Sequence, residues 1–92
     1  MTTIRTTITN IGLFNADGIE VRNNRATNGK DLAGIFANAR STDNLFRDNR
    51  ALNNQQFDCW DKSEGTSTSG TANTWINDIG EKDRPSGICR VP

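Results

Sequence analysis

The chain repeats Val21-Arg22-Asn23-Asn24-Arg25-Ala26-Thr27-Asn28 as Phe46-Arg47-Asp48-Asn49-Arg50-Ala51-Leu52-Asn53. Around this pair, residues 44–49 return as 73–78, Gly12-Leu13-Phe14 returns as Gly34-Ile35-Phe36, and a third version of that step is Asp58-Cys59-Trp60. These matches are roughly 22 to 29 residues apart, a spacing typical of solenoid repeat units. Each unit consists of short alternating apolar stretches separated by Asn, Asp and Gly, which predicts short strands joined by tight turns.

Strand alternation divides the apolar residues among three inward-facing walls. The first wall holds Leu13, Ile35, Ala37 and Cys59, the second holds Ile19, Val21, Phe46 and Trp75, and the narrow third holds Ala26 and Ala51. Asparagine suits the turns between walls because its side chain tolerates the left-handed backbone region. Stacking of equivalent turns predicts a structural ladder in which Asn24 lies over Asn49, and Asn28 over Asn53, with their amides hydrogen-bonded along the stack.

The repeats predict a single all-β domain over residues 1–92. Its expected parts are an N-terminal partial coil (1–10), repeat coils (11–61), a Ser/Thr/Gly-rich loop (62–72), and a last coil with a C-terminal cap (73–92). Hydrophobic residues make up 33% of the chain and the mean hydropathy is -0.70. With so few apolar residues in so short a chain, folding depends on their periodic placement.

The closing segments are the most distinctive part of the sequence. They are Phe57-Asp58-Cys59-Trp60-Asp61, Gly70-Thr71-Ala72-Asn73-Thr74-Trp75 and Pro85-Ser86-Gly87-Ile88-Cys89. Together with the repeated steps, they resemble the C-terminal ends of bacterial right-handed parallel β-helix proteins of the pectin-lyase-like superfamily, over about Ile11 to Cys89. The resemblance implies a short right-handed parallel β-helix of about three coils. Members of this superfamily usually carry many more coils, so two interpretations stay open: a fragment of a longer protein, or a unit that needs partners.

Composition and charge exclude several kinds of partner. Eleven Lys and Arg balance eleven Asp and Glu, and no basic block is present to follow a phosphate backbone, so we expect no nucleic-acid partner. No apolar run approaches the roughly 18 residues that span a bilayer, so we expect no membrane partner. The chain begins without the apolar stretch of a secretory signal, which leaves a cytosolic protein or the mature portion of a secreted one.

Two cysteines and no histidine cannot complete a tetrahedral zinc site. The simplest use of Cys59 and Cys89 is one disulfide, with two reduced buried thiols as the alternative. A disulfide closing a loop of about 30 residues is worth on the order of 3 to 4 kcal/mol. If it forms, a secreted or cell-surface location is favoured.

Aspartates are the candidate catalytic groups. The resemblance implies clustered carboxylates that cut acidic polysaccharides, with calcium in the lyases or as acid and base in the hydrolases. Asp43, Asp58 and Asp61 are the candidates, on the hypothesis that they meet on one face. The competing interpretation, which we favour, is turn chemistry at strand ends. Apart from calcium under the lyase hypothesis, no cofactor and no metal site is expected.

A row of aromatic residues is the candidate binding site. Phe14, Phe36 and Trp60 each follow an inward residue, so alternation points them outward, about 4.8 Å apart. Such a row suits sugar rings or another protein, unless the N-terminal segment or the loop after Asp61 covers it. We rank a homo-oligomer interface above a carbohydrate site because the predicted helix is short.

Four arginines also repeat in register. Arg22, Arg25, Arg47 and Arg50 are expected to form a solvated face in which Asp48 and Asp78 pair with them, with an anion-binding strip as the alternative.

The sequence thus favours a non-catalytic structural or binding module that presents a β-helix face. The expected partners are a second copy of the chain, a longer β-helix or a glycan. The alternative is a carbohydrate-active enzyme, a polysaccharide lyase or glycoside hydrolase, or a fragment of one.

Overall fold

A computed structural model describes residues 2–4, 7–8, 10–30 and 33–92 of the chain. Its strands are β1 (Thr2–Ile4), β2 (Thr7–Ile8), β3 (Ile11–Leu13), β4 (Ile19–Arg22), β5 (Arg25–Thr27), β6 (Ala33–Ala37), β7 (Leu45–Arg47), β8 (Arg50–Leu52), β9 (Phe57–Asp61), β10 (Thr74–Ile76) and β11 (Asp83–Arg84). One short 3-10 helix, η1 (Thr68–Gly70), lies within the segment predicted as a loop. The chain is therefore all-β, as predicted.

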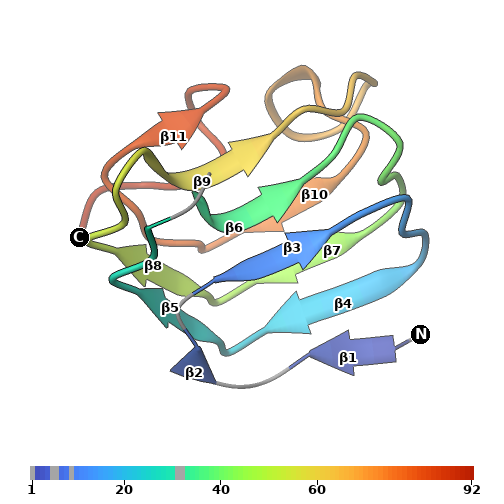
Figure 1. Cartoon of the computed structure of the whole chain (residues 1–92). Coiled ribbons are helices and arrows are strands. Elements are labelled where there is room, and N and C mark those ends of the chain that lie inside the picture. The colour runs from blue at the N-terminus through green and yellow to red at the C-terminus, as the bar shows by residue number, and fades with distance from the viewer. Residues whose placement is uncertain (1, 5–6, 9, 31–32) are drawn as a thin grey trace.

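The strands form three parallel sheets (Figure 1). We call β1-β4-β7-β10 the first sheet, β2-β5-β8 the second sheet and β3-β6-β9-β11 the third sheet, each in spatial order. The chain passes through the first, second and third sheets in turn, and one such passage is called a circuit below. Circuits begin at β1, β4, β7 and β10. In the circuit that begins at β10, the second sheet is continued by Ile79, which is bridged to Arg50.

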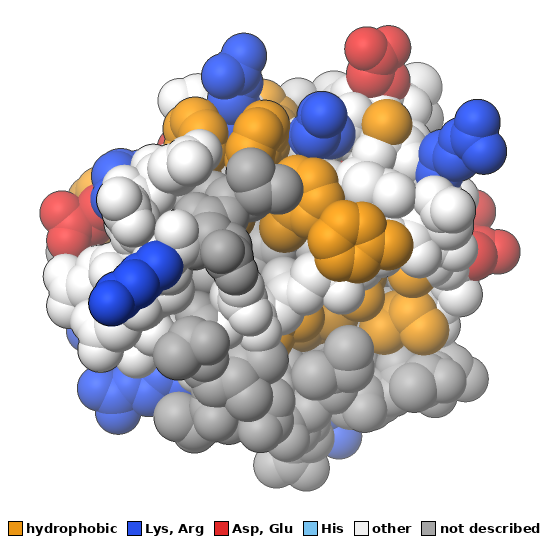
Figure 2. Space-filling model, viewed as in Figure 1, with side chains coloured by type: hydrophobic (Ala, Val, Ile, Leu, Met, Phe, Trp, Pro, Cys, Tyr) orange, Lys and Arg blue, Asp and Glu red, His pale blue; other side chains and the backbone are white. Residues whose placement is uncertain are grey.

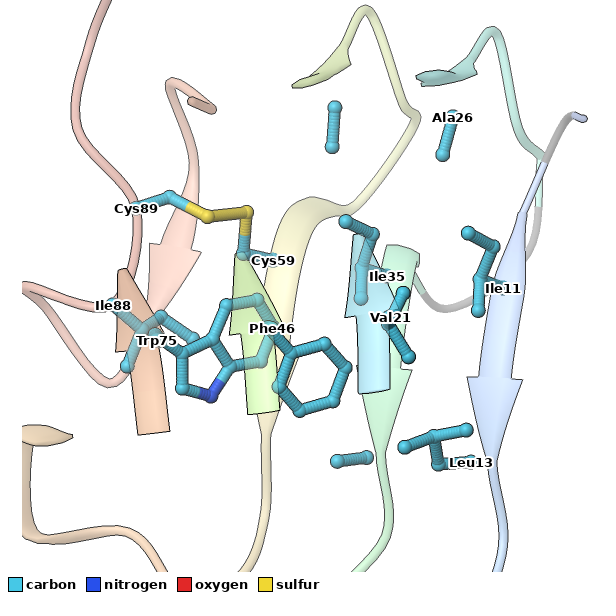
Figure 3. Packing of buried hydrophobic residues seen from close by; sticks show 12 residues of the cluster. Ile11, Leu13, Val21, Ala26, Ile35, Phe46, Cys59, Trp75, Ile88 and Cys89 are labelled. Carbon is cyan, nitrogen blue, oxygen red and sulfur yellow. A yellow bond between two sulfur atoms is a disulfide. The ribbon is translucent and has the colours of Figure 1, made fainter. Parts of the chain in front are cut away.

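The core lies between the three sheets (Figure 3). The first sheet contributes Val21, Phe46 and Trp75 in lateral register. The rings of Phe46 and Trp75 are stacked, with centroids 3.9 Å apart and planes at 13°. Ala26 and Ala51 are fully buried on the second sheet, where their small side chains leave room for these rings. Alternation thus predicted most of the core, but it missed Ile11 and Ile88, which are also buried.

The predicted register of the first repeat was wrong by two residues. Ile11, not Leu13, pairs with Ile35, and Leu13 pairs with Ala37. A two-residue shift keeps every side chain on its own face, so the inward pattern survives it. The shift places Gly12 beside Phe36, and a Cβ atom on Gly12 would lie 2.6 Å from the Phe14 ring. The glycine therefore leaves the space into which that ring folds back.

Buried asparagines connect successive circuits. As predicted, Asn24 lies over Asn49, whose Oδ1 accepts from the Asn24 main-chain N–H at 3.0 Å and from its Nδ2 at 3.1 Å. Asn44 and Asn73 are joined in the same way. The prediction for Asn28 and Asn53 was wrong, because both are exposed left-handed turn residues (φ 61° and 59°), and the described part of the chain shows no bond between their side chains. The buried amide at that turn is the next residue, Asn54.

The C-terminal segment, residues 81–92, covers the Trp75 end of the core. Ile88 lies against this end, and Cys89 forms the predicted disulfide with Cys59 (Figure 3). The disulfide is weakly consistent with an extracellular location. The described residues include no helix long and apolar enough to cross a membrane.

Candidate functional site

Asp58 is buried, and both oxygens of its carboxylate accept hydrogen bonds from other parts of the chain. Its Oδ1 accepts from the main-chain N–H of Asn54 at 3.1 Å and from Asn54 Nδ2 at 3.0 Å. Its Oδ2 accepts from the N–H groups of Glu81 and Lys82 at 2.9 and 3.1 Å. The carboxylate joins the Asn54 turn to the C-terminal segment, so Asp58 has a structural role.

Asp61 stands at the other end of β9 and is equally saturated. Its Oδ1 accepts from the N–H and the hydroxyl of Ser63, at 2.9 and 2.6 Å. Its Oδ2 accepts from Asn73 Nδ2 at 3.0 Å and from the indole Nε1 of Trp75 at 2.9 Å. This carboxylate therefore fixes the core tryptophan and the turn after β9.

The three candidate aspartates do not form one site. Asp43 is an exposed turn residue in the left-handed region (φ 59°), whereas Asp58 and Asp61 are buried. Among the residues that the structure describes, no group of three His, Cys, Asp or Glu side chains is placed to hold a metal ion. The hypothesis that these carboxylates meet on one face was wrong. Asp58 and Asp61 both belong to strand β9, but Asp58 binds the Asn54 turn and Asp61 binds the turn at Ser63.

The predicted aromatic row is a compact cluster on the outer face of the third sheet. The centroids of Phe14 and Phe36 are 5.5 Å apart, and those of Phe36 and Trp60 are 5.4 Å apart. Phe57 adds a fourth ring, 5.0 Å from Trp60. We call Phe14, Phe36, Phe57 and Trp60 the aromatic patch.

Exposure within the patch is uneven. Phe14 is 65% exposed, Trp60 and Phe57 are half-buried, and Phe36 is only 7% exposed. The expectation that Phe36 is an open binding residue was wrong, because the rings of Phe14 and Trp60 flank it. Phe36 instead forms the floor that holds Phe14 in place.

Cationic side chains border the aromatic patch. Lys62 Nζ lies 5.7 Å from the centroid of Trp60, and the guanidinium of Arg84 lies 6.0 Å from that of Phe57. A hollow of about 640 Å³ adjoins the patch, lined by Phe14 and Phe36 and also by Lys30. Figure 2 shows orange side chains over β3, β6 and β9 with blue Lys and Arg side chains beside them, while the red Asp and Glu side chains lie toward the edges of the view.

Alternation along β9 could not reveal Phe57 as a patch residue. Phe57 stands two residues before the inward Cys59, so strict alternation would turn both side chains inward. In the structure Asp58 and Cys59 are both buried, and the Phe57 ring contacts Trp60 instead.

The predicted pairing of the arginines with acids holds for Asp48 but not for Asp78. Arg47 Nε lies 3.6 Å from Asp48 as expected, and Arg22 Nε lies 3.6 Å from Glu20. Asp78 was expected to pair with the arginines, and this was wrong. It is only 2% exposed, and its Oδ1 accepts from the Asn49 main-chain N–H and from Asn49 Nδ2, at 3.1 and 2.8 Å.

Comparisons with known proteins do not identify the chain. No protein-family model matches it, and searches of curated proteins and of solved structures gave no significant match. The aromatic patch and the buried aspartates are therefore the features of the chain that bear on its function.

Proposed function

We propose that the chain is a short right-handed parallel β-helix that acts as a non-catalytic binding module and stacks sugar rings of a glycan on its aromatic patch. The observation that carries the proposal is the Phe14 ring, which is 65% exposed and yet held against Phe36. An exposed ring with a fixed orientation offers a flat apolar face at little cost in side-chain entropy.

The β-helix architecture is supported by the order in which the chain visits its sheets. Each circuit enters the first, second and third sheets in the same sequence, and every strand pair is parallel. Asparagines at equivalent turns bond from one circuit to the next. Such repetition is what a solenoid requires, because each unit contacts mainly its neighbours.

The absence of catalysis is supported by the state of the carboxylates. A general acid or base must reach its substrate proton. Asp58 and Asp61 each accept four hydrogen bonds from the fold and are 0% and 4% exposed. Neither has the access that a hydrolase or lyase needs.

A glycan suits the aromatic patch better than a second copy of the same face. Lys30, Lys62 and Arg84 adjoin the patch and outnumber the exposed acid Glu64 beside Trp60, so self-association through it would bring an excess of positive charge together across the interface. A sugar makes no such repulsion, and its ring faces stack well on aromatic side chains. We therefore place the glycan first, in contrast to the ranking from sequence.

Phe14→Ala is expected to weaken binding in a glycan-array or calorimetric assay at least tenfold, because it removes the exposed ring and opens Phe36 to water. Trp60→Ala should weaken it to a similar degree. Ile76→Ala is the matched control, since Ile76 is also exposed (44%) but lies on β10 of the first sheet. Equal binding by Phe14→Ala and the parent, or no binding by the parent to any neutral or acidic glycan, would refute the proposal.

Self-association is a second candidate because of one specific feature. Strands β1, β2 and β3 pair only with β4, β5 and β6, so within the described residues their other edges are unpaired. Unpaired edges are templates for strands of another molecule. The C-terminal segment covers the opposite end, which favours a closed two-fold dimer over an open fibre.

Sedimentation equilibrium tests this candidate directly. We expect a monomer–dimer equilibrium that Thr3→Lys in β1 shifts toward monomer, because a charge on an edge strand opposes pairing. Lys62→Thr, directly after β9 and away from these edges, is the control and should leave the equilibrium unchanged. A strict monomer at millimolar concentration would eliminate the candidate.

A further inference from the structure

Three arginines without an ion pair lie in one column on the outer face of the second sheet. Arg25 pairs with Arg50, Ile79 is bridged to Arg50, and Arg90 is bridged to Ile79. Residues paired across a parallel sheet point to the same face, and all three arginines are exposed. Over the described ranges, arginine ion pairs are confined to Arg22 and Arg47. Arg25, Arg50 and Arg90 thus have no ion-pair partner among the described residues.

The turn beside this column ends in a main-chain donor with no acceptor. The N–H of Asn23 donates to the Arg47 carbonyl at 3.2 Å, and that of Asp48 donates to the Ile76 carbonyl at 3.0 Å. Each N–H therefore points to the next circuit. Asn77 holds the same left-handed position (φ 55°) at the last such turn, where no described residue accepts from its N–H. This N–H points toward the level of Arg90, one rung beyond Ile79.

A hollow of about 320 Å³ joins these donors. It is lined by Asp48, Asn49, Arg50, Asn77, Ile79 and Arg90. Arg50 and Arg90 flank Ile79, so their backbones are two strand spacings, about 9.6 Å, apart. That separation admits one oxyanion between two guanidinium groups at ordinary charge-assisted hydrogen-bond lengths. The acid in the hollow, Asp48, is offset by Arg47 at 3.6 Å.

We propose that this hollow is an oxyanion site that binds a phosphate or sulfate group between Arg50 and Arg90, with the Asn77 main-chain N–H as a third donor. Arginine forks match the oxygens of such groups, and a free N–H adds a directed bond. The site is distinct from the aromatic patch, which lies on the third sheet. The same chemistry serves a free inorganic anion or a sulfate or phosphate substituent on a larger ligand.

Titration with sodium sulfate and with sodium phosphate, at ionic strength held constant with chloride, tests the site by ¹H–¹⁵N NMR. We expect saturable shifts of the main-chain amides of Asn77, Ile79 and Arg90. Arg50→Gln and Arg90→Gln should each weaken binding at least tenfold. Because both residues are exposed, the rest of the spectrum should stay unchanged and report an intact fold.

Arg25→Gln is the matched control. Arg25 has the same charge and lies in the same column, but outside the hollow, so its replacement should change the affinity less than twofold. Equal losses in Arg25→Gln and Arg90→Gln would mean non-specific screening and would overturn the proposal, as would shifts that do not saturate. Sulfated dextran, tested beside plain dextran, distinguishes the two sources of the anion. If the protein binds sulfated dextran much more tightly than free sulfate, and Arg90→Gln loses that binding, the natural ligand is a sulfate or phosphate substituent on a larger molecule. If sulfated dextran binds no more tightly per sulfate group than free sulfate, the ligand is the free anion.

Discussion

Replacement of both Cys59 and Cys89 by alanine is expected to lower the free energy of unfolding by about 3 to 4 kcal/mol. The disulfide joins residues 30 apart in the sequence, and a cross-link over a loop of that length removes about this much chain entropy from the unfolded state. Small domains have limited cores, so the loss is a large fraction of their stability. Urea unfolding followed by tryptophan fluorescence measures it, since Trp75 lies against Phe46 in the core.

The wild-type chain with its disulfide reduced is the control for this prediction. Cys59 is completely buried, so its replacement also removes packing, whereas reduction leaves both sulfur atoms in place. The double variant should therefore be at least as unstable as the reduced parent. A midpoint unchanged by both treatments would show that the C-terminal segment holds its place without the cross-link, through Ile88 and the bonds to Asp58.

The features that sequence predicted well depend on periodicity. Val21, Phe46 and Trp75 recur at equivalent positions, and alternation turned them inward without knowledge of their partners. The ladder from Asn24 to Asn49 followed for the same reason, because identical turns in successive repeats must stack. The two cysteines were few enough for their pairing to be the simplest hypothesis.

The errors concern features that periodicity does not contain. Aligning the similar sequences Gly12-Leu13-Phe14 and Gly34-Ile35-Phe36 would pair Phe14 with Phe36. In the structure, Gly12 is the residue that pairs with Phe36. The missing side chain of glycine, rather than the similarity of the two steps, determines where the Phe14 ring can lie. Alternation therefore correctly predicted that Phe14, Phe36 and Trp60 lie on one face. It could not predict that the Phe14 ring folds over Phe36 and buries it.

The favoured interpretation of Asp58 and Asp61 as turn residues is confirmed, but the distant donors that each aspartate binds could not be predicted from sequence. Asp58, Asp61 and Asp78 are all buried, and which of them is satisfied depends on donors from distant turns. Asp58 and Asp61 accept main-chain and side-chain hydrogen bonds on both oxygens. Asp78 accepts on Oδ1 alone, and its Oδ2 is buried with no hydrogen-bond partner in the described part of the chain.

The asparagine ladder explains why Asp78 is the exception. Asn49 Nδ2 donates to the Val21 carbonyl at 2.8 Å, and Asn44, Asn54 and Asn73 donate to equivalent carbonyls. Phe46 is the partner of Val21 one circuit on, so its carbonyl is the equivalent acceptor for residue 78. An ionised Asp78 would present Oδ2 where the ladder requires a donor. A protonated Asp78 supplies one.

Stability is expected to fall as pH rises, because of this one carboxyl group. Burial raises the pKa of Asp78 from its ordinary 3.8 to about 7, and the nearby charge of Asp48 adds to the rise. Between these two values the folded state keeps a proton that the unfolded state has lost, so the free energy of unfolding decreases by about 1.4 kcal/mol per pH unit. The decrease levels off above pH 7, after a total on the order of 4 kcal/mol.

Asp78→Asn should remove that decrease, because the amide donates at every pH and cannot ionise. We expect the variant and the parent to be nearly equal in stability at pH 4, and the variant to be more stable by several kcal/mol at pH 8, as measured by urea unfolding at each pH. Asp48→Asn is the matched control: it removes a neighbouring but exposed carboxylate and should retain most of the slope. The difference between the parent and variant curves isolates residue 78 together with its coupling to Asp48. Parallel curves from pH 4 to pH 8 would show that Asp78 is ionised in the folded protein and that its Oδ2 finds a donor.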